Sequence, residues 1–580
     1  MKLLRLGIAI ATLGLSAPAF SETVFVDQGS SWTGNLRNSF YTRDQGSRIM
    51  PVAWMRALKQ SDGSPFLDDA LSRYGYLPMP GRSDGDLPVG FTTNSFGDST
   101  AVGMTCAACH TREIEVDGTA YRIDGGPGIV DFQNFLKDLD VSVLALLKDE
   151  AAFQAFSDEV LGSDASSSEK DALREELSIW SKRFHTLVER SLPDPAWAPG
   201  RLDAVSMIFN RLTGLDIGEE EKDYLIPDNI QVADAPTRYP FLWNAARQDF
   251  TQWPGFAANG NDLLGLARNL GEVYGVFGEF HPVKKPGVLF EHDFITKNSA
   301  NWDGLNDLED WIWDIGAPAW PWAIDEQLAS QGKEIFNLST ENGGCVECHG
   351  ERRGKFRSLK HSTFATPIID VGTDIRECQI LTRKVKTGTL EGAKIPIVGK
   401  ELGAEATAFE VLSVSVSNAI IQHATTLRSD SVQDDSGFAM SANTLADDEE
   451  FMARFNDLTK AFPLPDEVAE LAASAGVGCK YEARVLKGIW AAAPYLHNGS
   501  VPTLEELLKK PDDRVTSFIP GPSYDVQAVG MAKQQTKFDQ VIKTTGCDQL
   551  DSGNSRCGHD YGTDLSNDQK RALLEYLKSI

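Results

Sequence analysis

The chain has 580 residues, of which 42% are hydrophobic, and its formal net charge at pH 7 is −28. This length allows several domains with cores of their own, and the hydrophobic content excludes a disordered chain. The acidic balance argues against nucleic acid and anionic membranes as partners, and no apolar run beyond the N-terminus could span a bilayer.

The first residues have the pattern of a signal peptide. Lys2 and Arg5 precede or border an apolar run from Leu6 to Leu15, and Ala19-Phe20-Ser21 is a small-x-small cleavage site. The apolar run is too short for a membrane anchor, so we expect residues 1–21 to be removed on export. The mature protein is then periplasmic or secreted.

The first chemical motif follows a stretch without strong periodicity. Residues 22–100 are rich in Gly, Pro, Asp and Ser, which predicts an irregular wrap with a few helices. The next segment, VGMTCAACH, contains C-x-x-C-H, the attachment signal for a c-type haem. Cys106 and Cys109 would bind the haem covalently, and His110 would be the proximal ligand of its iron.

The middle of the chain alternates between helical and aromatic stretches. Residues 132–192 carry apolar side chains at helical spacing, which predicts long helices. Aromatic residues then gather at 239–256 and at 300–322. We expect these two stretches to form a core layer between domains or an apolar wall beside a haem.

A second haem motif opens the other half. Residues 325–337 have the apolar spacing of an amphipathic helix, and GCVECHG follows them with Cys345, Cys348 and His349. Segments of 380–440 that alternate Val, Thr and Ile predict some β-structure. Ser566-x-x-Gln569 resembles a capping box at the start of a terminal helix.

The pattern predicts a mainly α protein with little β-structure. A helix before C-x-x-C-H and a helix at the C-terminus are the two crossing helices of a class I cytochrome c fold. We therefore expect two class I cytochrome c-like haem domains with large insertions and extended loops. The first haem domain would occupy residues 101–324 and the second residues 325–580.

Four of the eight cysteines lie outside the two motifs. An even remainder in an exported protein predicts two disulfides, for which three pairings can be drawn. The pairing that we favour joins Cys547 to Cys557 across a short loop and leaves Cys378 with Cys479.

The sixth ligand of each iron decides what each haem can do. A haem closed on both faces transfers electrons, whereas an open face permits chemistry. No histidine occurs between His110 and His185, and a lone histidine such as His185 on a helix is more often a surface residue than a ligand. His497 in PYLHNGS and His559 in RCGHDYG both belong to the second half.

These segments resemble a known superfamily. KGIWAAAPYLHNGSVPTLEELL (Lys487–Leu508) resembles the bacterial di-haem cytochrome c peroxidase superfamily, which includes the MauG-type maturation enzymes. The wider pattern of YGYLPMPGR, VGMTCAACHT, RIDGGPG and GHDYGTDLS resembles its rubber-oxygenase-like (RoxA-like) branch. The resemblance implies two covalently bound haem c groups, with the first haem reactive and the second storing or relaying electrons.

The resemblance also implies roles for individual residues. A tryptophan between the haems corresponds to Trp243 in PFLWN, with Trp253 as its rival. His559 would close the second haem and His497 would shape its pocket, although the reverse order stays open. Glu272 in ARNLGEVYG is the candidate distal acid, and its alternative is an exposed helix glutamate.

Two departures from the peroxidase pattern favour the oxygenase-like branch. Peroxidases of the superfamily close the second haem with a methionine after the HNGS loop, whereas Met531 lies in an unmatched context. They also carry a histidine soon after the first C-x-x-C-H, and this chain has none before His185. We therefore expect the first haem to be open.

Three functions follow from this reading. The first haem could reduce H2O2 with electrons from a small c-type cytochrome or cupredoxin. It could instead activate O2 against a C=C bond of an isoprenoid or unsaturated fatty acid. A non-catalytic periplasmic electron carrier is the alternative of another class. The sequence leaves open whether a calcium ion is also bound.

Overall fold

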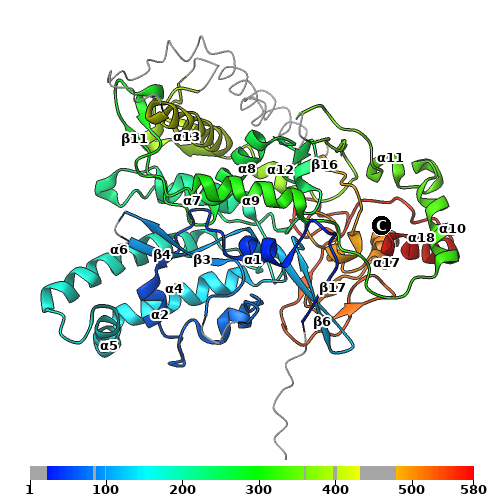
Figure 1. The fold of residues 1–580 in the computed structure, drawn as a ribbon, viewed down its shortest axis with the longest axis horizontal. Coiled ribbons are helices and arrows are strands. Elements are labelled where there is room, and N and C mark those ends of the chain that lie inside the picture. Colours follow the sequence, from blue (N-terminus) through cyan, green and yellow to red (C-terminus); the bar gives the residue numbers. More distant parts are fainter. Residues whose placement is uncertain (1–22, 82–85, 98, 358–360, 396–400, 432–478) are drawn as a thin grey trace, which may run out of the picture.

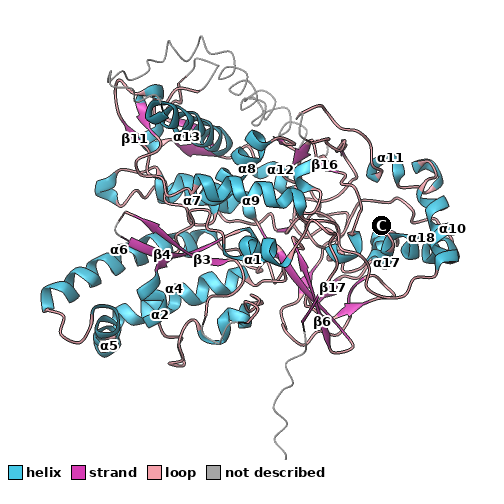
Figure 2. Cartoon of the chain, viewed as in Figure 1, coloured by secondary structure: helices cyan, strands magenta, loops and turns pink. Residues whose placement is uncertain are grey.

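Helices and small sheets share the fold. The computed structural model describes residues 23–81, 86–97, 99–357, 361–395, 401–431 and 479–580. The proposed signal peptide lies outside these residues. Figure 2 shows helices throughout the molecule with short strands between them. No helix in the described ranges is long and apolar enough to cross a membrane.

The described helices have the following bounds: α1 Gly34–Thr42, α2 Val52–Ala57, α3 Cys106–Cys109, α4 Phe132–Lys148, α5 Glu150–Leu161, α6 Ser167–Ser191, α7 Ala204–Arg211, α8 Asp262–Gly275, α9 Trp302–Asp314, α10 Glu326–Phe336, α11 Val346–His349, α12 Arg376–Ile380, α13 Ala408–Ser431, α17 Leu504–Leu507 and α18 Asn567–Lys578.

The strands pair in sheets of two or three, and their bounds are β1 Thr23–Phe25, β2 Met50–Pro51, β3 Phe91–Phe96, β4 Ser99–Met104, β5 Thr111–Val116, β6 Thr119–Asp124, β7 Arg201–Leu202, β8 Thr237–Arg238, β9 Phe250–Thr251, β10 Ala257–Ala258, β11 Val283–Lys284, β12 His292–Asp293, β13 Ile368–Ile369, β14 Lys384–Lys386, β15 Glu405–Thr407, β16 Tyr481–Glu482, β17 Ser517–Phe518, β18 Tyr524–Asp525, β19 Gly530–Met531 and β20 Ile542–Lys543.

Two three-stranded sheets flank the first C-x-x-C-H. Strand β4 of the sheet β2-β4-β3 ends two residues before α3. Strand β5 of the sheet β1-β6-β5 begins directly after His110. A Cβ atom on Gly90, which has φ +76°, would meet the backbone nitrogen of Ala108 at 2.0 Å, so this close approach requires glycine. The described residues of the segment 22–100, predicted as an irregular wrap with a few helices, include the helices α1 and α2 and the strands β1, β2 and β3.

A helical lobe formed by α4, α5 and α6 lies at one end of the molecule (Figure 1). This confirms the helices predicted over 132–192, and the spaced apolar side chains of Phe153, Phe156, Leu173 and Leu177 are buried. The start of α6 is fixed by a capping box between Ser166 and Glu169.

Some of the β-structure predicted over 380–440 forms, as the short strands β14 and β15. Most of the other described residues of this range belong to α13, which the alternating pattern did not predict. The alternating valines of α13, such as Val411, Val414 and Val416, are all buried, because this helix packs against α8 and α7. Burial on most faces removes the amphipathic period and lets β-branched residues fill a helix.

The second C-x-x-C-H lies beside a pair of contacting helices. Figure 1 shows α10 and α18 together at the end opposite the α4–α6 lobe, with α11 close by. Gly332 lets the two helices touch, since a Cβ there would meet the carbonyl oxygen of Ala572 at 1.9 Å. Phe336 packs edge-on against Tyr576 with ring centroids 5.3 Å apart. The capping box of Ser566 and Gln569 is present as predicted.

The first motif has a different setting. Strand β4, and not a helix, precedes Cys106. A helix before the motif that contacts a later helix, as a class I fold requires, is therefore seen only for the second motif, with α10 and α18. The class I description of both domains stays a prediction.

Both favoured disulfides are confirmed. Cys378 is bonded to Cys479 and Cys547 to Cys557, with Cα atoms 6.0 and 5.0 Å apart. The four cysteines of the two C-x-x-C-H motifs are free.

Candidate functional site

The first motif opens on a cavity of about 1260 Å³, a volume that includes space open to solvent. Cys106, Cys109 and His110 line it. Nδ1 of His110 donates a hydrogen bond of 2.9 Å to the carbonyl oxygen of Pro240, which orients the ring and leaves Nε2 for an iron atom. Burial lowers the pKa of His110 to about 4, so the imidazole is neutral and able to ligate a metal.

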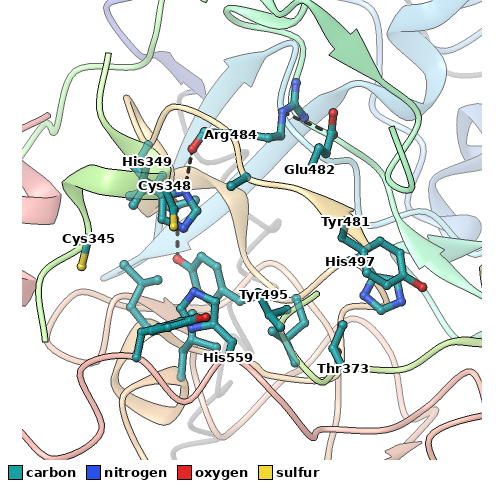
Figure 3. A pocket seen from close by; sticks show the side chains of 18 of the residues that line it. Cys345, Cys348, His349, Thr373, Tyr481, Glu482, Arg484, Tyr495, His497 and His559 are labelled. Atoms are coloured by element: carbon teal, nitrogen blue, oxygen red, sulfur yellow. Dashed lines mark hydrogen bonds and ion pairs between the residues drawn. The ribbon is translucent and has the colours of Figure 1, made fainter. Parts of the chain in front are cut away.

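The second motif has the same construction. Cys345, Cys348 and His349 line a separate cavity, again of about 1260 Å³ (Figure 3). Nδ1 of His349 donates a hydrogen bond of 2.7 Å to the carbonyl oxygen of Arg484. Burial lowers the pKa of this histidine as well.

The cysteines do not have the properties of a thiol redox pair. Burial raises the pKa of Cys106 and Cys109 to about 12 and that of Cys345 to about 11. Reactive C-x-x-C thiols have lowered pKa values, because the thiolate is the nucleophile. Free cysteines beside an oriented histidine fit covalent attachment of haem.

His559 faces His349 across the second cavity (Figure 3). The ring centroids lie 6.1 Å apart. Two imidazoles on opposite faces of one metal ion, each bonded at about 2 Å, place their centroids roughly 6 Å apart. Nδ1 of His559 has no hydrogen-bond partner among the described residues, and its φ of 54° lies in the left-handed region. The geometry therefore fits a six-coordinate iron between His349 and His559.

His497 lines the same cavity but faces another group. Its ring stacks on Tyr481 with centroids 3.8 Å apart, to one side of the His349–His559 pair in Figure 3. Burial lowers the pKa of His497 to about 3. This placement suits a residue that shapes the wall of the cavity.

The first cavity contains no second histidine among the described residues that line it. The histidines at 185, 281, 292, 361 and 423 line neither described cavity and have other neighbours: Asp140, Tyr224, Thr389, Trp313 and Trp302 respectively. Met207 is a further side chain of the first cavity that contains a ligating atom.

Glu272 lines the first cavity beside the polar side chains of Gln252 and Arg268. Its carboxylate accepts a hydrogen bond of 3.1 Å from Gln252, and Arg268 lies one turn earlier on α8. Burial raises the pKa of Glu272 above its ordinary value. The exposed alternative considered for this residue does not describe its setting, because Glu272 is half-buried and belongs to the cavity wall.

The two tryptophans considered for the path between the sites have different positions. Trp243 is fully buried, donates through Nε1 to the carbonyl oxygen of Lys487 at 2.7 Å, and stacks on Phe241. Phe241 lines the second cavity, so Trp243 lies one ring behind that wall. Trp253 lines both cavities.

Charged residues between the cavities were missed by the sequence reasoning. Arg238, Glu482 and Arg484 are buried and line both cavities with Trp253. Nη1 of Arg484 has no hydrogen-bond partner among the described residues, as a site for an acidic group of a bound cofactor requires. The sequence signal for these buried charges was the charged segment KYEARV directly after Cys479. Solvent-exposed strands show the same pattern, so the segment alone did not indicate burial.

No group of three or more His, Cys, Asp or Glu residues that could hold a metal ion occurs in the described part of the chain. The binding of calcium therefore gains no support from side-chain clusters there.

A family match covers part of the chain that lines the second cavity. Residues 480–519 match the family described as RoxA-like, cytochrome c-like. This match covers Arg484, His497 and the turn that receives Trp243, and it implies haem c and an oxidoreductase that uses it.

Two relatives come from Sinorhizobium fredii (strain NBRC 101917 / NGR234). The uncharacterized protein y4iJ is 27% identical over an alignment of 632 residues in length. The alignment covers 97% of this chain and 94% of that protein. The uncharacterized protein y4iM is 22% identical over 416 residues, which cover 68% of this chain and 74% of that protein. The likeness to y4iJ thus extends through both C-x-x-C-H motifs.

Proposed function

We propose that the chain is an exported di-haem c-type cytochrome oxidoreductase related to the di-haem cytochrome c peroxidases and the MauG-type enzymes. The first haem, on His110, activates a small oxidant, and the second, between His349 and His559, stores or relays electrons. The observation that carries this proposal is the asymmetry of the cavities. One holds two facing histidines, and the described lining of the other holds one.

Peroxide is the oxidant that the polar wall of the first cavity favours. Haem supplies a redox-active iron there when it is bound. Glu272, whose pKa burial raises, keeps a proton to higher pH than a surface glutamate and can deliver it to the departing oxygen atom of H2O2. Gln252 holds the carboxyl group in place, and Arg268 adds a positive charge beside it.

O2 is the alternative oxidant, with an unsaturated apolar substrate. The match to the RoxA-like family supports it, and so does the apolar part of the same cavity. That part is lined by Phe132, Leu202, Val205, Met207, Ile208, Leu242, Val276 and Ile312. Such a wall would exclude water and receive an isoprenoid or a fatty-acid chain.

A small c-type cytochrome or a cupredoxin would deliver electrons to the second haem in the peroxide version. The periplasm is the compartment that suits such an exchange, given the signal-peptide pattern and the two disulfides. A pure electron carrier is the competing class, and it would need both haems closed.

Spectroscopy of the purified protein tests the proposal. We expect two haems per chain, with one low-spin and the other high-spin or oxygen-bound by optical absorption and EPR, and CO binding to the reduced protein. His110→Ala should remove the open signal and leave the low-spin one. Two low-spin haems that bind no CO, or a methionine charge-transfer band lost in Met207→Leu, would contradict an open first haem.

A further inference from the structure

Three hydrogen bonds, linked by covalent bonds of the protein, connect the two proximal histidines. His110 donates to the carbonyl oxygen of Pro240 at 2.9 Å, and Pro240 is bonded to Phe241. The carbonyl oxygen of Phe241 accepts a hydrogen bond of 3.0 Å from Nη2 of Arg484. The carbonyl oxygen of Arg484 itself accepts from His349 at 2.7 Å.

Arg484 is therefore bonded toward both sites at once. Its backbone carbonyl accepts a hydrogen bond from His349. Its side chain donates to the carbonyl oxygen of Phe241, the residue after the Pro240 that accepts from His110. The guanidinium carbon lies 4.1 Å from the centre of the Phe241 ring, and that ring stacks on Trp243 at 4.7 Å. Figure 3 shows the bond between His349 and the backbone of Arg484.

The guanidinium has a fixed position. Its Nε donates to Oε1 of Gln248 at 2.7 Å and lies 3.7 Å from Glu482. The residue is 6% exposed, so solvent neither competes for these bonds nor screens the charge effectively. One planar guanidinium thus donates to two separate acceptors, Gln248 and Phe241, which the single ammonium group of a lysine could not do in this fixed geometry.

We propose that Arg484 is the positioning residue of the electron route between the two haems, through the path His349–Arg484–Phe241–Pro240–His110. This inference deepens the proposed function and rests on it. One electron leaves the ferrous iron at the second site, which becomes ferric, and enters the ferric iron at the first site, which becomes ferrous. Both Nδ1–H groups keep their protons, so no proton transfer accompanies the step.

The rate of this transfer tests the route. The reduced first site is loaded with CO while the second site is oxidised, and the redistribution of the electron is followed after photolysis of CO. Arg484→Met should slow the redistribution several-fold more than the accompanying change in the two midpoint potentials explains, since loss of a buried positive charge shifts both potentials. Arg484→Lys, which keeps the charge and one donor group, should restore part of the rate.

Arg201→Met is the matched control. Arg201 is also buried and its guanidinium also donates to backbone carbonyl oxygens, but these belong to Trp197 and Asn498, and Arg201 lines neither described cavity. Its replacement should leave the transfer rate unchanged. Trp243→Phe tests the competing route through the stacked tryptophan.

An unchanged rate in Arg484→Met would overturn the proposal, as would an equal loss in Arg201→Met or a loss seen only in Trp243→Phe. A loss explained by altered midpoint potentials would overturn it too. Where Arg484→Met does not take up both haems, Arg484→Lys decides by the same criterion. Failure of the proposed function appears earlier and separately, as a single haem or no CO binding in the unaltered protein.

Discussion

His559 and His497 share a cavity, yet only one of them lies where an iron atom could bind it. The 6.1 Å between the rings of His349 and His559 is the decisive distance, and the stacking of His497 on Tyr481 explains why a histidine is present without facing the iron. Sequence patterns placed both histidines near the second motif, but they could not tell which ring points inward, because ring direction depends on contacts with distant residues such as Tyr481.

Replacement of each histidine should separate the two roles. His559→Ala removes the sixth ligand, so we expect the low-spin signal to become high-spin and a new CO-binding site to appear. His497→Ala should leave the low-spin signal in place and lower only the thermal stability, because stacking on Tyr481 is lost. Optical and EPR spectra of the two variants make the comparison. A low-spin signal that survives in His559→Ala would contradict the assignment.

Glu272 gives a prediction for pH dependence. Because burial raises its pKa, the carboxyl group stays protonated over a wider pH range than a surface glutamate and ionises as pH rises through the raised value. Peroxide turnover that uses this proton should be highest below that pKa and fall above it. Glu272→Gln should lower turnover by about 10²- to 10⁴-fold and abolish this pH step.

The exposed helix residue Glu334 provides the control for this experiment. Glu334→Gln should keep both the turnover and the pH profile of the unaltered protein, measured as oxidation of a reduced cytochrome c by H2O2. A Glu272→Gln variant with normal peroxide turnover would move the chemistry to another acid or to O2.

At the scale of elements, periodicity predicted several helices that have one polar face, missed others such as α9, and missed α13, which is buried on most sides. The helices at 132–192, 325–337 and the C-terminus show apolar residues at regular spacing because one side of each meets solvent. The helix α13 is buried on most sides, so its valines and serines resemble a strand. Thr407 and Glu410 bond each other's backbone as a capping box, which was the local sign of its start.

The contact between α10 and α18 should depend on Gly332. A methyl group there would meet the backbone oxygen of Ala572, which cannot rotate away, so Gly332→Ala should lower stability by about 1–3 kcal/mol. Gly271→Ala on α8 is the control, because its new methyl would meet Leu412 at an ordinary 3.7 Å and the helix gains about 0.5–1 kcal/mol. Thermal unfolding followed by haem absorption measures both. Equal effects at the two positions would contradict the packing argument.

At the scale of the molecule, the cysteine count and the spacing of the motifs predicted both disulfides and two separate sites. The residues between the sites could not be predicted. Arg484 and Phe241 are 243 positions apart in the sequence, and Arg484 and Gln248 are 236 apart. Such pairs form only when the two halves fold against each other, and a single sequence carries no local mark of them.

The long-range disulfide should matter most for stability. Cys378–Cys479 spans 101 positions and Cys547–Cys557 spans 10. Loop-closure entropy predicts losses of about 4.7 and 2.7 kcal/mol on replacement of each pair by alanine. Denaturant unfolding of the two double variants measures the difference. The opposite order would show that strain or residual structure outweighs loop length.

The acceptors of the two proximal histidines have a consequence for maturation. Each C-x-x-C-H motif is local, so covalent attachment of haem needs only a short segment of chain. The carbonyl groups that orient His110 and His349 lie 130 and 135 positions away. Under the proposed function, a newly exported chain would carry its haems before either iron has its final environment. The redox potentials of the two centres would then report how far the chain has folded.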